Sequence, residues 1–172
     1  MWIEDSHPRT YDAVVDAAGG GDYTTLQAAD DELDGGAYTV YVKAGTYAAG
    51  LTVSTNDALW VFEAGVIIQA ACTLSGANVG WLCGPGFDLQ AALTVSGTDG
   101  YIQCMNDADF DGVAFNGNSG MFDGGGHGTL VNGGTGNGFS GTGADITVKN
   151  AAALCTAGGG NNVDAILVQG AR

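Results

Sequence analysis

The sequence is poor in basic residues, and this shortage excludes two kinds of partner. Only 4 Lys and Arg residues stand against 19 Asp and Glu, which gives a formal net charge of −15 at pH 7. Nucleic-acid phosphates are held by clustered Lys and Arg, and an anionic membrane surface attracts the same residues. We therefore expect no nucleic-acid and no membrane partner. The acidity serves solubility, or else an acidic surface that faces a basic partner or cations.

Long apolar runs, a secretion signal and metal-binding cysteine spacing are also missing. No apolar stretch reaches the ~18 residues of a membrane-spanning helix. Residues 1–5 (MWIED) open neither a basic nor an apolar segment, so we expect no signal peptide. Without secretion and without Cys-x-x-Cys or Cys/His spacing, the cysteines are expected to be free, buried thiols. They are Cys72, Cys83, Cys104 and Cys155.

Glycine, by contrast, is abundant, with 31 glycines against 2 prolines among 172 residues. This composition is typical of a fold with many tight turns between short strands. Hydrophobic residues make up 45% of the chain, enough for the core of a single domain. We assign residues 11–172 to that domain. Residues 1–10 show no periodicity, and we interpret them as an N-terminal arm that orders only against a partner, or else as a frayed terminus.

A repeat of 21 residues begins at residue 51 and indicates a solenoid. The successive units are residues 51–71, 72–92, 93–113 and 114–134. Equivalent positions alternate between apolar and polar, which is typical of strands with one buried face. The first strand of each unit is predicted to point inward at two columns: Leu51, Cys72, Leu93 and Ala114, then Val53, Leu74, Val95 and Asn116. The second strand contributes Trp60, Trp81 and Ile102, then Phe62, Cys83 and Cys104. The third contributes Val66, Phe87 and Ala108, then Ile68, Leu89, Phe110 and Val131.

Three short strands in each unit of 21 residues predict an all-β fold, a short right-handed parallel β-helix of about five to six coils. Each strand then pairs with its equivalent one coil on, at about 4.8 Å. The period blurs after residue 134, although 146–150 and 163–169 are still strand-like. A leucine-rich repeat would need an LxxLxL signature, which is absent, and a β-sandwich would need no strict period.

Residues 22–34 predict a helix that caps the first coil. Leu26, Ala29 and Leu33 fall on one helical face, with Asp22 or Thr24 as the N-cap, and 35–36 (GG) end the helix. Such a cap is needed because the open end of a β-helix is a template for further strands. The far end has no helical pattern, so we expect loops, a second subunit or a larger assembly to cover it.

Residues 19–47 (GGGDYTTLQAADDELDGGAYTVYVKAGTY) resemble the opening of the pectin-lyase-like superfamily, in which a GxGDYxTIQAAIDA helix precedes a VYVxxGTY strand. The resemblance implies a β-helix. Pectin methylesterases, phage tail spikes and other virion proteins share this opening, so it implies no single activity. Asp30 departs from the pattern, which has an apolar residue there; we expect the arm or a partner to complete the cap.

The family's enzymes need residues that this chain lacks. Their lyases resemble one another in a calcium-binding Asp cluster and an arginine base, and their esterases in two aspartates with an arginine. Here the only arginines are Arg9 and Arg172, and the only lysines are Lys43 and Lys149. Anionic pectin would also be repelled. We therefore expect no enzyme, with a polysaccharide lyase or esterase as the alternative.

Three other groups of residues suggest chemistry, but each has a simpler structural explanation. Asp88 and Asp109 lie one coil apart and could form a glycosidase pair, or simply a solvated strand face. The DxDxDG string of Asp107, Asp109 and Asp111 resembles a calcium loop, yet its twelfth position is Asn118 and the repeat places it on a strand. His127 lies alone in a glycine-rich loop. We therefore expect no catalytic residue, cofactor or metal site.

The function that these expectations favour is structural. The resemblance to phage β-helices and the lack of catalytic groups suggest a virion protein of a tailed phage, assembled in the host cytoplasm. A compact chain with a short arm suits a capsid decoration (cement) protein that binds the major capsid protein as a homotrimer. This step is an analogy between folds. The alternatives are a tail spike or receptor-binding module, and a carbohydrate-active enzyme.

Overall fold

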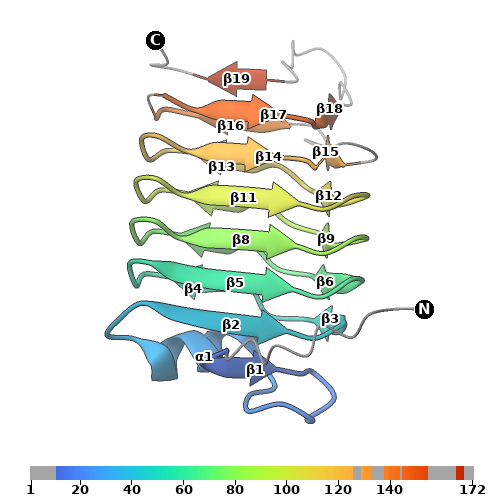
Figure 1. The fold of residues 1–172 in the computed structure, drawn as a ribbon. Helices are drawn as coiled ribbons and strands as arrows, with labels where there is room; N and C mark the ends of the chain where they lie inside the picture. The colour runs from blue at the N-terminus through green and yellow to red at the C-terminus, as the bar shows by residue number, and fades with distance from the viewer. Residues whose placement is uncertain (1–10, 126–128, 133–137, 144, 155–165, 169–172) are drawn as a thin grey trace, which may run out of the picture.

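The chain folds into a parallel β-solenoid with one helix at its N-terminal end (Figure 1). The computed structural model describes residues 11–125, 129–132, 138–143, 145–154 and 166–168. Three parallel sheets run along the solenoid, and from β2 onward each three consecutive strands belong to three different sheets and make one coil. The all-β fold and the parallel pairing predicted from the repeat are confirmed, and so is the capping helix predicted within residues 22–34. The described part of the chain contains no helix with the length and hydrophobicity needed to cross a bilayer.

The broad sheet is named after its longer strands, and the threonine and acidic sheets are named after residues on their outer faces. The broad sheet contains β1 (Ala13–Val15), β2 (Tyr38–Val42), β5 (Ala58–Phe62), β8 (Gly80–Cys83), β11 (Tyr101–Cys104), β14 (Met121–Asp123) and β17 (Thr147–Lys149). The threonine sheet contains β4 (Thr52–Val53), β7 (Cys72–Leu74), β10 (Leu93–Val95), β13 (Val113–Phe115), β16 (Phe139–Gly141) and β19 (Ile166–Val168). The acidic sheet contains β3 (Gly45–Tyr47), β6 (Val66–Ile68), β9 (Asp88–Leu89), β12 (Asp109–Phe110), β15 (Leu130–Asn132) and β18 (Ala152–Leu154).

Strand register stacks like side chains into ladders inside the solenoid. Trp60 pairs with Trp81, which pairs with Ile102, and all three are fully buried. Rings from different sheets meet in the centre, where the Phe87 centroid lies 5.0 Å from Phe62 and 5.4 Å from Phe110. The two tryptophans are therefore core residues, as predicted. Because side chains alternate along each strand, this interior dictates which face of every strand is buried.

The repeat places Cys83 and Cys104 in one inward column, and the structure confirms this arrangement. Cys83 and Cys104 are register partners on β8 and β11, and both are buried and free. Burial raises the pKa of the Cys83 thiol, and the neighbouring Cys104 raises it further. Cys72 is buried and free as well, whereas Cys155 lies outside the described residues. These described thiols act as small core side chains.

The predicted register of the fourth unit is wrong by one residue. Leu93 pairs with Val113 rather than with Ala114, and Val95 pairs with Phe115 rather than with Asn116. Val113 and Phe115 are buried, whereas Ala114 is half-buried and Asn116 is exposed. The connection from β12 to β13 is one residue shorter than the equivalent connection one coil earlier, and Gly112 takes a φ of +102° in it. Hydrophobic burial of Phe115 therefore sets the register, not the sequence count.

The capping helix α1 (Leu26–Leu33) is shorter than the predicted 22–34. Thr25 is its N-cap, and the Thr25 hydroxyl accepts a hydrogen bond from the Ala28 amide. Asp22 does not cap the helix, because its carboxylate accepts from the Val14 amide instead, and Tyr23 forms a β-bridge to Val15. Residues 22–24 are thereby held to β1, and the helix starts only after them.

The helix closes the solenoid through two polar contacts as well as through buried Leu26 and Ala29. The Gln27 side chain accepts from the Thr52 amide (2.8 Å) and donates to the Thr52 carbonyl (3.3 Å), so it satisfies the edge of β4. Asp30, which departs from the family pattern, is buried and accepts a hydrogen bond from the Tyr38 hydroxyl of β2. Burial raises the pKa of Asp30. Among the described residues, Tyr38 and Gln27 thus supply the hydrogen bonds of Asp30. The expectation that the arm or a partner completes the cap stays a prediction, because residues 1–10 lie outside the described residues.

Candidate interaction surface

The predicted carboxylate pair lies on the outer face of the acidic sheet. Asp88 and Asp109 are register partners on β9 and β12; Asp88 is half-buried and Asp109 is exposed. The Gln90 amide donates to the Asp88 carboxylate at 2.7 Å. Partial burial raises the pKa of Asp109, and the charges of Asp88 and Asp111 raise it further. The structure therefore brings the two carboxylates together, but on an open strand face, as the structural interpretation expects.

The three aspartates of the DxDxDG string do not converge. Asp109 and Asp111 flank buried Phe110 and are exposed, while Asp107 precedes them with a φ of +52° in the turn. Within the described ranges, no group of three or more His, Cys, Asp and Glu side chains is placed to hold a metal ion. His127, Arg9 and Arg172 lie outside the described residues.

Both lysines are held by aspartates in the described structure. Lys43 contacts Asp16 at 3.2 Å, and Lys149 contacts Asp123 at 3.0 Å. The pKa of Asp16 is lowered, first by the hydrogen bond from the Ala18 amide and then by Lys43. The pKa of Asp123 is likewise lowered, first by the Asn150 amide and then by the Gly125 amide and Lys149.

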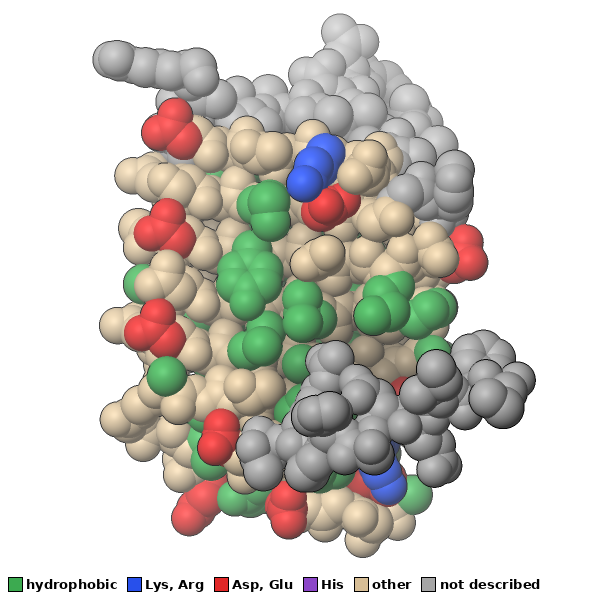
Figure 2. All heavy atoms as spheres, in the orientation of Figure 1, with side chains coloured by type: hydrophobic (Ala, Val, Ile, Leu, Met, Phe, Trp, Pro, Cys, Tyr) green, Lys and Arg blue, Asp and Glu red, His purple; other side chains and the backbone are tan. Residues whose placement is uncertain are grey.

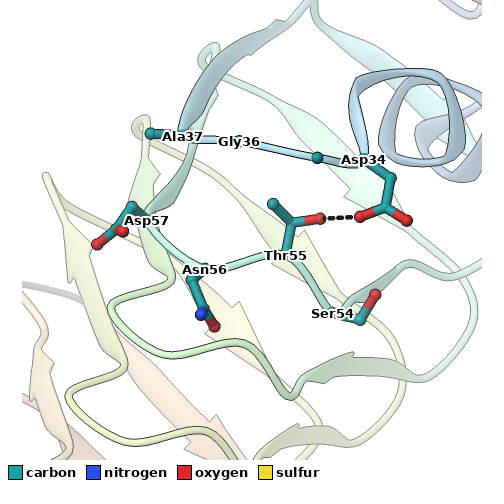
Figure 3. A pocket seen from close by; sticks show the side chains of 8 residues that line it. Asp34, Gly36, Ala37, Ser54, Thr55, Asn56 and Asp57 are labelled. Atoms are coloured by element: carbon teal, nitrogen blue, oxygen red, sulfur yellow. Dashed lines mark hydrogen bonds between the residues drawn. The ribbon is translucent and has the colours of Figure 1, made fainter.

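A polar hollow of about 340 Å³ lies where the cap meets the first coil (Figure 3). Its walls are residues 34–37, which follow α1, and residues 54–57, which follow β4. The Thr55 hydroxyl donates to the Asp34 carboxylate at 2.8 Å across it. The hydrogen bond joins the two walls, so the polar groups of this hollow fasten the cap to the solenoid.

The outer face of the broad sheet has a different character from these acidic and polar regions. Its outward positions from β2 to β11, and the first of β14, carry no charge, and most are aliphatic or aromatic. In Figure 2 hydrophobic side chains occupy the middle of this face, while acidic side chains lie along its edge and at the base. We call this region the apolar face. It consists of Thr39, Tyr41, Leu59, Val61, Gly80, Leu82, Tyr101, Gln103 and Met121.

Tyr101 flattens the centre of the apolar face. A Cβ placed on its register partner Gly80 would lie 2.0 Å from the Tyr101 ring, so the ring covers the glycine. At the lower edge, Tyr11 stacks on Tyr41 with ring centroids 4.9 Å apart. Burial raises the pKa of Tyr41 to about 12, with contributions from Glu63 and Tyr11.

A groove of about 250 Å³ borders the apolar face, lined mostly by apolar side chains. Tyr41, Val61 and Leu82 of the face line it together with Pro85 and Met105. Met105 is 65% exposed, the one large hydrophobic side chain that is exposed among the described residues. Glu63 also lines the groove, where its carboxylate accepts from the Ala44 amide at 2.7 Å.

The sequence contains a signal for this surface that the inward columns concealed. Strand β5 is Ala-Leu-Trp-Val-Phe, a continuous apolar run, which is typical of a strand covered on both faces. Trp60 and Phe62 point inward, so Leu59 and Val61 are apolar without being needed for the core. The outward positions of the second strand in each coil are therefore the residues that the repeat analysis left unassigned.

Comparison with known protein families, curated proteins and solved structures finds no match for this chain. The architecture on its own defines the class, a helix-capped parallel β-solenoid of acidic composition whose broad sheet is largely apolar on its outer face from β2 to β11.

Proposed function

We propose that this chain is a non-enzymatic structural protein of a virion, a capsid decoration protein of a tailed phage. The observation that carries the structural part is the apolar face, because an uncharged, largely apolar patch on a protein of net charge −15 suits contact with another protein. The described acidic residues supply neither a converging metal site nor an enclosed carboxylate pair. The phage setting is supported by the resemblance of residues 19–47 to β-helix proteins of virions.

In this proposal the protein stands on the shell as a homotrimer bound to the major capsid protein. The arm, residues 1–10, makes the attachment; it lies outside the described residues. The described chain begins at Tyr11, which stacks on Tyr41 of the apolar face. Attachment and self-contact are thus assigned to different parts of the chain.

The test is rebinding to particles that lack the protein. Purified chain is added to virions from a strain in which its gene is deleted, and bound protein is measured after sedimentation. We expect saturable binding to the shell, and weaker binding by a variant without residues 1–10 that keeps its β-sheet circular dichroism. Equal binding by the truncated variant would refute the role of the arm.

Two results would replace the proposal itself. Binding confined to a few copies at the tail would favour a tail spike or receptor-binding module. Turnover of an acidic or neutral polysaccharide by the purified chain would show an enzyme.

A further inference from the structure

We infer that the apolar face is the surface through which copies of this chain contact one another. This inference rests on the proposed oligomer and deepens it, because it names the residues in contact. It requires no virion for its test, so it can fail while shell binding stands, and shell binding can fail while it stands.

Charge distribution is the first argument. Two chains that each carry a net charge of −15 repel one another unless they meet where acids are absent. No outward position of the broad sheet from β2 to β11 is acidic. Asp123 on β14 is the register partner of Gln103, and its charge is neutralised by Lys149 at 3.0 Å. On the acidic sheet, in contrast, Asp88 and Asp109 pair in register. The outward strand positions of the broad sheet thus bring no carboxylate opposite a second copy, and Glu63, which lines the groove beyond the end of β5, is held by the Ala44 amide at 2.7 Å. The threonine sheet also lacks acids at its outward positions, so the apolar side chains are what distinguish the broad sheet from it.

Shape is the second argument. A contact between identical chains requires each copy to carry both a projection and a recess that can receive it. The apolar face has both at one border, where Met105, 65% exposed, lines the groove together with Tyr41, Val61 and Leu82. Methionine is unbranched and adapts to irregular apolar recesses. The Met105 side chain of one copy therefore fits the kind of recess that a second copy presents.

The size of the surface indicates how strong the contact is. Four strand intervals at about 4.8 Å and about five residues at 3.3 Å make a plane of roughly 300 Å². A standard interface buries about 800 Å² per partner. Because the apolar face is less than half that area, we expect a weak association that is populated only at high protein concentration. Because the contact is apolar and the repulsion is ionic, salt strengthens it, as the screening length falls from about 10 Å at 0.1 M to about 3 Å at 1 M.

Sedimentation equilibrium with matched variants tests the inference. The test variant is Val61→Asp with Leu82→Asp, two register partners on the apolar face. The control is Thr73→Asp with Thr94→Asp, two register partners on the threonine sheet. All four positions are half-buried, and both variants add two adjacent negative charges. We expect the wild type and the control to exceed the 17.2 kDa monomer mass increasingly with concentration, and the test variant to remain at 17.2 kDa.

A wild-type chain that stays monomeric at millimolar concentration in 1 M salt would overturn the inference, and so would equal dissociation of both variants. Oxidation of Met105 by hydrogen peroxide gives a reading without any substitution. Its rate should fall as wild-type concentration rises, and an unchanged rate in a sample that does oligomerise would place the contact elsewhere. Association that salt weakens would likewise overturn the inference, since it would indicate contact between opposite charges.

Discussion

The hydrogen bond between Tyr38 and Asp30 should stabilise the cap, and Tyr38→Phe removes it with little change in shape. The phenol donates to a carboxylate that is 3% exposed. Loss of the donor leaves a buried acceptor with only the long Gln27 contact at 3.4 Å. A buried group left without a partner costs about 1–3 kcal/mol, so we expect the free energy of unfolding at pH 7 to fall by that amount.

The pH dependence makes this prediction specific. Burial raises the pKa of Asp30, and the Tyr38 hydroxyl opposes that rise. The folded wild type therefore binds the Asp30 proton more tightly than the unfolded chain does. This group's contribution is most favourable below the unfolded pKa of about 3.8 and declines as pH rises through the folded pKa. Tyr38→Phe raises the folded pKa further, so its cost should shrink as Asp30 becomes protonated in acid.

Urea unfolding followed by tryptophan fluorescence suits the measurement, because the Trp60 ring lies 6.3 Å from the Tyr38 ring. The control is Tyr101→Phe on the apolar face, expected to change stability by less than about 0.5 kcal/mol. In an Asp30→Leu background, Tyr38→Phe should lose most of its effect. Equal effects of the two Tyr→Phe changes, or a cost that does not decrease in acid, would refute the reasoning.

Other substitutions and reagents test the remaining parts of the fold. Gln27→Ala removes two hydrogen bonds from the edge of β4 and should lower stability by about 1–2 kcal/mol in urea unfolding, whereas Gln69→Ala, at an exposed position after β6, should be nearly neutral. Val113→Asp should unfold or strongly destabilise the protein while Ala114→Asp is tolerated, as judged by thermal unfolding; the opposite result would restore the register counted from the repeat. Phe110→Ala should cost about 3–5 kcal/mol, because it empties the middle of the ring ladder. Burial raises the pKa of Cys72 to about 11 and that of Cys83 well above its usual range, so both should resist a thiol-specific reagent at pH 8 until urea unfolds the chain.

The interior of the central coils could be predicted from the sequence because its period is regular. Trp60, Trp81 and Ile102 recur every 21 residues, and the structure pairs them in that order. The one-residue slip at Val113 could not be found by counting, since it arises from a shorter turn at Gly112. The alternation of large and small side chains at Val113, Ala114 and Phe115 is consistent with the observed register, in which the Phe115 ring is buried.

The start of the helix and the character of the broad sheet needed three-dimensional information. Several residues near 22–25 have N-cap side chains, and only the pairing of Tyr23 with Val15 shows that the chain is still extended there. In the sequence, Asp88 and Asp109 form a candidate carboxylate pair, but the structure places them on an open strand face. The apolar run of β5 indicates that Leu59 and Val61 are covered on the outer face, but it does not show which residues lie beside them. Leu59 and Val61 become a surface only when Leu82 and Tyr101 of later coils lie beside them.

The number of copies in purified virions tests the central claim most directly. Quantitative mass spectrometry of native particles would compare this chain with the major capsid protein. The proposal predicts hundreds of copies in a fixed ratio to the shell subunit, with no change when tails are removed. A handful of copies that leave with the tail, or none in the particle, would contradict it.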